Sequence, residues 1–401
     1  MKKTLKQTLV AGVAVAALAA PLSAMADVKI GFLGGFTGPI ESLVPPIGDA
    51  AQLAAKHVND QGGILGGTME VVTGDTTCAD ATAAANAADR LVNVENVTAI
   101  VGALCSGATI SSANNAGVPG NVVMISPAST SPALTALEDN DLVFRTAPSD
   151  AYQGEVLARL LNSKGVGDIA ITYVNNDYGK GFADALEAAY SGLGGTVAAN
   201  EAHEDGKADY RAELGSLSSS GATTLVVLAY ADGSGQTVVR QALEAGDFTT
   251  FVGGDGMVSD TLPENAGASI DGMIATRPGT PEVPGAEIYA ELATAGELDP
   301  TATFGAQSYD AAFILALAIQ KQGSADRDGL AAAVRDVASA PGEVILPGEW
   351  EKAVGLLAAG TDINYEGGSG SHEFDAAGDV PGLIVEMTVT DGKFVEVGVA
   401  E

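Results

Sequence analysis

The chain has few of the residues that carry most enzyme and metal chemistry. It contains two cysteines, three histidines and one tryptophan among 401 residues. The histidines, His57, His203 and His372, lie far apart and have no H-x3-H spacing, so no metal site is expected. No G-x-x-x-x-G-K-[ST], G-x-S-x-G or H-E-x-x-H motif occurs. These absences favour binding over catalysis, and paired carboxylates among the 51 acidic residues stay open as an alternative.

A dinucleotide cofactor is also not expected. The glycines after the first apolar run, Gly31, Gly34, Gly35 and Gly38, fail the G-x-G-x-x-G spacing. We interpret them as a turn where the backbone lines a cleft, and we expect no cofactor.

Basic residues are scarce. The chain has 19 Lys and Arg against 51 Asp and Glu, which gives a net charge of −32 at pH 7. Such a charge repels DNA, RNA and anionic membrane faces, so no nucleic-acid partner is expected. It also favours a soluble monomer. A saline habitat and an ordinary acidic secreted protein both fit this composition.

Long apolar runs are missing, because no segment has about 18 uninterrupted apolar residues. A shorter run, residues 9–20, follows a lysine-containing start and precedes Ala24-Met25-Ala26. A basic start, a short apolar core and small residues at the cleavage positions are typical of a secretory signal peptide. We predict that residues 1–26 are removed before Asp27, so that the mature chain is soluble and lies outside the cytoplasm. A short retained anchor is the alternative.

The two cysteines, Cys78 and Cys105, are candidates for a disulfide. In an oxidising compartment an isolated pair is typical of one disulfide. Closing that loop stabilises a fold by about 3–4 kcal/mol. Two free thiols are the alternative.

Strand-like and helix-like segments alternate along the mature chain. Strands are expected at residues 28–33, 69–72, 99–101, 122–125, 169–174, 225–228 and 250–252. Helices are expected at residues 47–59, 79–94, 106–116, 152–161, 181–190, 236–245, 286–292, 309–319 and 330–337. This alternation predicts parallel sheets covered on both faces. A second set of segments begins near Ala147, so we expect an α/β protein with two lobes and a ligand cleft between them. A final hairpin over 383–399, with its turn at Asp391-Gly392, is also expected.

A series of short motifs runs in order through nearly the whole mature chain. They are Val28 to Gly31 with Phe36 to Pro39, Asn59 to Ile64, Asp75 to Asp80 with Gly102 to Ser106, Ile125 to Thr130, Phe144 to Thr146, Asp177 to Gly181, and Tyr309 to Ala311. Their order and spacing resemble the periplasmic branched-chain amino acid-binding protein family, the substrate-binding proteins of ABC transporters.

The resemblance implies a type I periplasmic binding fold, in which two Rossmann-like lobes joined by a three-strand hinge close on a ligand. The crossovers are expected near Thr146, Thr276 and Gly368. The first lobe would comprise residues 27–146 plus 277–367, and the second lobe residues 147–276 plus 368–401.

The family also implies a function without catalysis. The chain is then expected in the periplasm of a Gram-negative bacterium, as a monomer that delivers an amino acid, branched-chain or otherwise neutral, to an inner-membrane ABC permease. A sensor that hands its ligand to a membrane receptor and a secreted hydrolase are the alternatives.

Three residues of the first lobe are candidates for the polar ends of a bound amino acid. The hydroxyls of Ser106 and Thr130 lie in turns after strands and are expected to hold the ligand carboxylate. Ala128 offers a backbone carbonyl to the ammonium. Helix capping is the alternative role for Ser106 and Thr130.

Three residues of the second lobe complete the predicted site. Asp255, between glycines, is expected to supply the charge opposite the ammonium, as the family often has an acid there. Tyr178 and Tyr230 are expected to cover the ligand and exclude water. An ordinary turn role for Asp255, and core or rim packing for the tyrosines, are the alternatives.

Two segments depart from the family pattern. The first loop, Glu41 to Pro46, is longer and is a further candidate for ligand contact. An extra stretch covers Trp350 to Asn364, where Trp350 is expected to pack on the surface. Phe304 is expected in the core rather than at the ligand.

Overall fold

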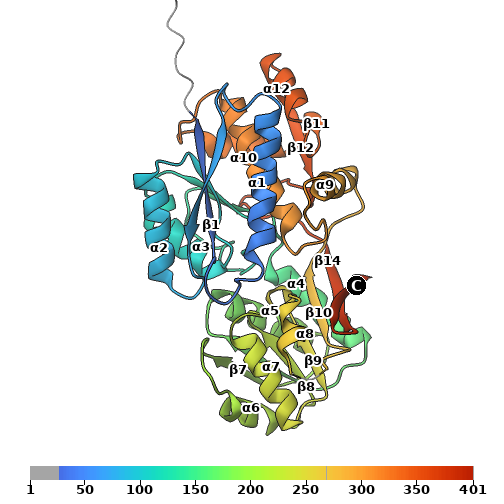
Figure 1. Cartoon of the computed structure of the whole chain (residues 1–401). Coiled ribbons are helices and arrows are strands. Elements are labelled where there is room, and N and C mark those ends of the chain that lie inside the picture. The colour runs from blue at the N-terminus through green and yellow to red at the C-terminus, as the bar shows by residue number, and fades with distance from the viewer. Residues whose placement is uncertain (1–26, 268, 401) are drawn as a thin grey trace, which may run out of the picture.

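The computed structural model describes residues 27–267 and 269–400, which form two α/β lobes stacked end to end (Figure 1). Each lobe has a mainly parallel sheet with helices on its faces, so the predicted fold class is confirmed. The predicted signal peptide, residues 1–26, lies outside the described residues. Within the described part of the chain, no helix is both long and apolar enough to span a bilayer.

The first lobe contains a five-stranded parallel sheet in the order β2-β1-β3-β4-β5. Its strands are β1 (Val28–Gly34), β2 (Met69–Asp75), β3 (Ala99–Gly102), β4 (Val123–Ser126) and β5 (Val143–Arg145). Every residue of β3 and β4 is buried, as expected for central parallel strands covered on both faces.

The helices of the first lobe come from two distant parts of the sequence. They are α1 (Val44–Asp60), α2 (Ala81–Asp89), α3 (Ser106–Ser112), α9 (Pro284–Ala295), α10 (Gly305–Gln322), α11 (Leu330–Ala338) and α12 (Trp350–Ala358). The π-helical turns η1 (Arg90–Val94) and η2 (Ala113–Gly117) continue α2 and α3. Helix α10 packs beside α1 and is buried from Gly305 to Ile319, because α11 and α12 cover it as well.

The second lobe contains a seven-stranded sheet in the order β15-β14-β10-β9-β8-β6-β7. Its strands are β6 (Ile169–Val174), β7 (Val197–His203), β8 (Thr224–Leu228), β9 (Thr250–Gly253), β10 (Ile274–Pro278), β14 (Ile384–Thr390) and β15 (Lys393–Val399). Its helices are α4 (Asp150–Ser163), α5 (Asp177–Gly192), α6 (Arg211–Ser218), α7 (Ser234–Ala245), η3 (Asp255–Met257) and α8 (Thr261–Asn265). From β7 to β10 the order repeats that of the first lobe, and β14 and β15 add an antiparallel edge.

The predicted C-terminal hairpin is confirmed. Asp391 and Gly392 have φ values of 51° and 73° between the antiparallel strands β14 and β15. A two-residue hairpin turn needs positive φ at both positions, which explains the Asp-Gly pair.

The chain around Gly368 is attached to the first lobe. The carboxylate of Asp310, in α10, accepts the backbone N–H groups of Gly368 at 2.9 Å and Ser369 at 2.7 Å. Asp379 then pairs with Arg145 of β5, with an Nε–Oδ1 distance of 2.6 Å. The chain therefore contacts the first lobe as far as Asp379 and enters the second sheet at Ile384, beyond the crossover expected near Gly368. The predicted division into lobes stays a prediction.

Trp350 is not on the surface, so this prediction was wrong. Its side chain is fully buried, its indole Nε1 donates to the carbonyl of Gly63 at 3.0 Å, and its ring meets that of Phe313 edge-on. Helix α12 connects the first two strands of a small sheet that contains β11 (Glu343–Ile345), β12 (Ile363–Gly367) and β13 (Gly370–Ser371). The extra stretch thus extends the core of the first lobe.

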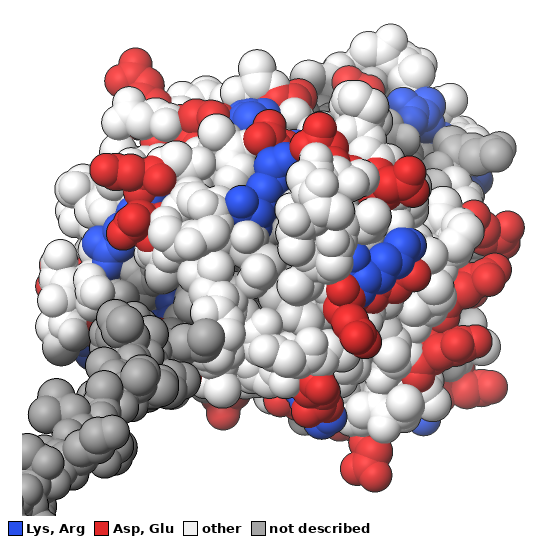
Figure 2. Space-filling view, turned by 90° about the horizontal axis from the view of Figure 1, so that it is seen from above, with Lys and Arg blue, Asp and Glu red and all other residues white. Residues whose placement is uncertain are grey.

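Acidic side chains are spread over the surface of the first lobe. In the view from above, red groups are scattered around the visible face and blue groups are few (Figure 2). This distribution reflects the composition of the chain, in which acidic residues outnumber basic ones by more than two to one.

Candidate ligand-binding site

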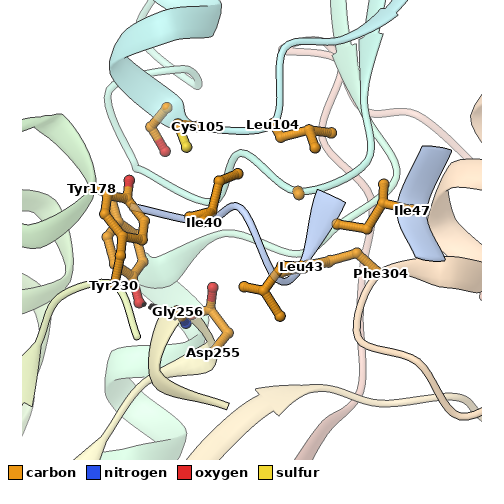
Figure 3. Close-up of a pocket in the computed structure, with 12 residues that line it drawn as sticks. Ile40, Leu43, Ile47, Leu104, Cys105, Tyr178, Tyr230, Asp255, Gly256 and Phe304 are labelled. Atoms are coloured by element: carbon orange, nitrogen blue, oxygen red, sulfur yellow. Dashed lines mark hydrogen bonds between the residues drawn. The ribbon is translucent and has the colours of Figure 1, made fainter. Parts of the chain in front are cut away.

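A narrow pocket lies between the two lobes (Figure 3). It is formed by loops that follow the carboxyl ends of strands in both sheets, together with the first turns of α1 and α5. In open α/β sheets, ligands bind at this edge. The first lobe contributes Ile40, Leu43, Ile47, Leu104, Cys105, Ser106, Ala128 and Phe304, and the second lobe contributes Tyr178, Tyr230, Asp255 and Gly256.

The structure brings five of the six predicted ligand contacts together at this pocket. They are Ser106, Ala128, Tyr178, Tyr230 and Asp255. Thr130, the sixth, is fully buried outside the lining. Its carbonyl accepts the backbone N–H of Asp150 at 2.7 Å, and among the described residues its hydroxyl has no hydrogen-bond partner.

Ser106 is the first residue of α3, and Cys105 occupies the N-cap position, so Ser106 does not cap the helix. Its Oγ accepts the backbone N–H of Ser131 at 3.2 Å, which links the turn after β3 to the turn after β4. The hydroxyl hydrogen is then free to donate to a group in the pocket.

The turn that carries Ala128 is held by side chains behind it. Ser126 Oγ accepts the backbone N–H of Ser129 at 3.0 Å. The buried guanidinium of Arg145 donates to the carbonyls of Thr130 and Ser131, both at 2.9 Å, while Asp379 neutralises its charge. Arg145 therefore positions the turn and lies outside the pocket lining.

The predicted disulfide between Cys78 and Cys105 is present, with a Cα–Cα distance of 5.6 Å. It joins the loop after β2 to the start of α3 beside the pocket. A Cβ at Gly35 would lie 2.7 Å from the sulfur of Cys78, so the loop after β1 needs glycine there. The disulfide thus holds together, at the pocket edge, the loops that follow β2 and β3, the two strands that flank β1 in the sheet.

Two stacked tyrosines form the wall from the second lobe. The rings of Tyr178 and Tyr230 lie 5.1 Å apart at an angle of 16°. The Tyr178 hydroxyl donates to Asp255 Oδ1 at 3.2 Å and accepts the backbone N–H of Gly256, also at 3.2 Å. Burial raises the pKa of both tyrosines, so both stay protonated.

Asp255 is the acid of the pocket and is 3% exposed. Its Oδ1 accepts hydrogen bonds from Tyr178 and from the side-chain Nε2 of Gln153, both at 3.2 Å. Burial raises the pKa of Asp255 to about 7. An ionised carboxylate in this position is costly unless a cation accompanies it, and within the described chain Asp255 forms no ion pair.

A second buried acid, Asp150, begins α4 next to this network. Within the described part of the chain, neither of its carboxylate oxygens has a hydrogen-bond partner, and burial and then the charge of Asp255 raise its pKa. Gln153, one turn later, also donates to the carbonyl of Thr276 in β10 at 3.0 Å. These contacts connect Asp255 to the chain segments that pass between the lobes.

Sequence reasoning missed most of the apolar lining. Ile40, Leu43, Ile47 and Leu104 were not singled out, although the long first loop was a candidate for ligand contact. Phe304 is buried, as expected, and it also lines the pocket, contrary to the sequence expectation. Asp150 and Gln153 were missed because an acid and an amide at a helix start resemble ordinary surface residues.

The chemistry of the lining suits a small molecule with an apolar body and two polar ends. Aliphatic and aromatic groups dominate it, with Ser106 as a hydroxyl donor and Asp255 as an anionic acceptor. Within the part of the chain that the structure describes, no cluster of three or more His, Cys, Asp or Glu side chains is suited to a metal ion.

Comparison with known proteins identifies the family. The sequence profile described as periplasmic binding protein matches residues 27–353. A Pseudomonas aeruginosa protein named leucine-, isoleucine-, valine-, threonine-, and alanine-binding protein is 30% identical over 329 residues, covering 82% of this chain and 87% of the relative. The Leu/Ile/Val-binding protein of Escherichia coli is 29% identical over 287 residues, covering 71% of this chain and 77% of that relative. The crystal structure of the leucine-binding protein LivK of Thermotoga maritima matches with a TM-score of 0.78 at 25% identity, covering 93% of this chain and 99% of that one. The resemblance inferred from the motifs is thus confirmed, and the chain belongs to the periplasmic binding protein family.

Proposed function

We propose that this protein captures a neutral, apolar L-amino acid between its lobes and delivers it to an ABC permease in the inner membrane. The observation that carries the proposal is the buried Asp255 carboxylate in a mainly apolar pocket, since it favours a ligand with a cationic group. The names of the relatives, which bind leucine, isoleucine and valine, support an apolar amino acid.

The proposed pose places the ligand ammonium at Asp255 and at the carbonyl of Ala128. The ligand carboxylate accepts the hydroxyl of Ser106, and Tyr178 and Tyr230 cover the ligand. Thr130 stays a predicted contact that the pocket lining does not include. Charge-assisted hydrogen bonds contribute about 1.5–3 kcal/mol each and compensate for removing the two charges from water.

The ligand side chain is proposed to lie among aliphatic residues of the first lobe. Ile40, Leu43, Ile47 and Leu104 offer apolar surface there, and Phe304 lies at the same wall. Burying a leucine-sized side chain contributes about 1.5–3 kcal/mol. A charged or strongly polar side chain would lose hydration without gaining a partner in this part of the pocket.

The cellular setting is part of the same proposal. A signal peptide over residues 1–26 would direct the chain to the periplasm of a Gram-negative bacterium, where it acts as a monomer and carries out no catalysis. The family membership and the composition of the N-terminal segment support this setting.

Calorimetry on protein stripped of bound ligand tests the function. L-Leucine, L-isoleucine and L-valine should bind with micromolar or better affinity, about 8 kcal/mol. The matched control ligand is 4-methylpentanoate, which has the leucine carbon skeleton without the amino group and should not bind measurably. Tight binding of 4-methylpentanoate, or no heat with any neutral amino acid, would contradict the proposal.

A further inference from the structure

A hydrogen-bonded cluster, separate from the pocket lining, also joins the two lobes. At its centre is Asp232, in the loop after β8 of the second lobe. Its Oδ2 accepts the backbone N–H of Ser42, in the first loop of the first lobe, at 2.7 Å. Its Oδ1 accepts the hydroxyl of Thr261, at the start of α8, at 2.8 Å. One carboxylate thus contacts both lobes.

Three further hydrogen bonds close this cluster. Ser42 Oγ lies 2.9 Å from Ser259 Oγ, and Ser259 Oγ lies 2.9 Å from Thr261 Oγ1. The backbone N–H of Asp232 donates to the carbonyl of Pro39 at 3.2 Å. The segment Pro39–Leu43 of the first lobe is therefore tied at two points to loops of the second lobe.

The same segment carries part of the apolar wall of the pocket. Ile40 and Leu43, on either side of Ser42, both line the pocket, and they face it from the loop of the first lobe (Figure 3). On the opposite side, Tyr230 lines the pocket two residues before Asp232. Fixing Ser42 against Asp232 therefore fixes aliphatic side chains over the space proposed for the ligand side chain.

The loop is closely packed at its base and ends at the start of a helix. Gly38 has a φ of 107°, and a Cβ there would lie 2.2 Å from the carbonyl oxygen of Thr77. At the other end, Val44 begins α1 with prolines in its first turn. A short segment between two fixed ends can be positioned by one strong contact.

Asp232 is not required to start a helix. Helix α7 begins at Ser234, and the carboxylate that accepts the backbone N–H of Ser234 belongs to Asp205, at 2.6 Å. Among the described residues, Asp232 has no ion pair with Lys or Arg. Backbone N–H bonds to a carboxylate are stronger than neutral ones, so the contact with Ser42 is the main interaction of this charge.

We propose that Asp232 is a positioning residue for ligand selection, which accepts the Ser42 N–H when the lobes close and so fixes Ile40 and Leu43 against the ligand side chain. This inference rests on the proposed function. When the lobes separate, Asp232 stays with Thr261 on the second lobe while Ser42 leaves with the first. The contact therefore stabilises the closed arrangement and slows ligand release.

The test compares Asp232→Ala with Asp260→Asn in full-length mature protein. Asp260 is an exposed acid of the second lobe close to this cluster, and its side chain makes no capping hydrogen bond, so it is a matched control. Release of labelled L-leucine and affinities for L-leucine and L-alanine are measured, together with the melting temperature of ligand-free protein.

Asp232→Ala should speed L-leucine release roughly tenfold and reduce the preference for L-leucine over L-alanine, because L-alanine does not reach Ile40 and Leu43. Asp232→Asn, which keeps an acceptor oxygen, should recover part of this loss. The melting temperature of ligand-free protein should match that of Asp260→Asn.

The inference would be overturned if Asp232→Ala had the same L-leucine release rate and the same ratio of L-leucine to L-alanine affinity as Asp260→Asn. It would also be overturned if Asp232→Ala lowered the melting temperature of ligand-free protein and left this affinity ratio unchanged. Failure of the unmodified protein to bind any neutral amino acid would instead contradict the proposed function, so the two failures are distinguishable.

Discussion

The two lobes share one strand order but bring different chemistry to the pocket. In the first lobe, the loops after β1, β3 and β4 contribute Ile40, Ser106 and Ala128. In the second lobe, the segments after β6, β8 and β9 contribute Tyr178, Tyr230 and Asp255. Within the order of each sheet, these are equivalent strands. The repeated topology sets where the pocket lies, and the side chains on each lobe set its polarity.

This difference makes the two walls of the pocket chemically unlike. The first lobe offers aliphatic surface and a hydroxyl donor, whereas the second offers aromatic surface and a buried carboxylate. A ligand with separate positive and negative ends is complementary to such a pair of walls, and two identical walls would not be. Removing a group from one wall should therefore change ligand binding differently from removing a group from the other.

Removing the carboxylate of the second lobe should have the largest effect. Asp255→Ala should weaken L-leucine binding by at least about 100-fold, since it leaves the ligand ammonium buried without its counter-charge. Titration calorimetry measures the change. Retention of wild-type affinity would show that the ligand cation lies elsewhere, and Asp260→Asn serves as the control for a lost charge at the surface.

Breaking the disulfide should affect the first lobe alone. The double variant Cys78→Ser with Cys105→Ser should lose about 3–4 kcal/mol of unfolding free energy, because the unfolded chain regains the freedom of the loop. Denaturant unfolding gives the magnitude, and hydrogen exchange locates it. Exchange should rise around β2 and α3 and stay constant in β6 to β9, and a uniform rise across both lobes would contradict this expectation.

The carboxylate should also make binding depend on pH. The pKa of Asp255 is about 7 in the ligand-free pocket, faced by Asp150, Tyr178, Tyr230 and Gln153. Below pH 7 the carboxyl group is protonated and no longer attracts an ammonium, so affinity should fall by up to about tenfold per pH unit. Ligand binding should release a proton near pH 7. In Asp255→Asn the affinity for L-leucine should be weak and independent of pH. If the affinity of this variant still changed with pH, another titrating group would cause the effect.

The raised pKa of Asp255 has an opposite consequence for stability. Because the folded pKa lies above the unfolded value near 4, ligand-free protein should lose stability as pH rises from about 4 to 7, by up to about 4 kcal/mol. Asp255→Asn should remove this loss, so the variant should melt at a higher temperature than wild type at pH 8 and at a similar one at pH 4. Equal melting temperatures at pH 8 would contradict the assignment.

The hydroxyl of the first lobe should have the smallest effect. Ser106→Ala removes one neutral donor and should weaken L-leucine binding by roughly tenfold or less. Its hydrogen bond with the Ser131 N–H is lost as well. A Ser111→Ala variant controls for the loss of a local hydrogen bond, because the half-buried Ser111 of the same helix donates its hydroxyl to the Ala81 carbonyl at 2.6 Å. An effect as large as that of Asp255→Ala would mean that the first lobe carries the dominant charge recognition.

The polar part of the site could be predicted because its residues follow strands. A buried apolar run that ends in a turn marks the carboxyl end of a parallel strand, and these ends meet at the cleft. Ser106, Tyr230 and Asp255 were found by this reasoning and by the family resemblance, and all line the pocket. Thr130 shows the limit of this reasoning, because it lies only two residues after Ala128 in the same turn and does not line the pocket.

The apolar part of the site could not be predicted in the same way. Leu43 and Leu104 are leucines, the residue type of an ordinary core. The periodicity of the sequence does not distinguish a side chain that packs against protein from one that lines a ligand pocket. Trp350 illustrates the reverse error, since a tryptophan in an unmatched stretch is fully buried in the first lobe. Burial at these positions depends on segments far away in the sequence.

The amino-acid sequence alone determined the alternation of strands and helices, the excess of acidic charge and the family, because these follow from local patterns and composition. Tertiary structure decided which distant residues share the pocket, that Asp255 is desolvated, and that Ser42 meets Asp232 across the lobes. Those properties arise from solvent exclusion and from contacts between separate chain segments, and neither is a property of any local stretch of sequence.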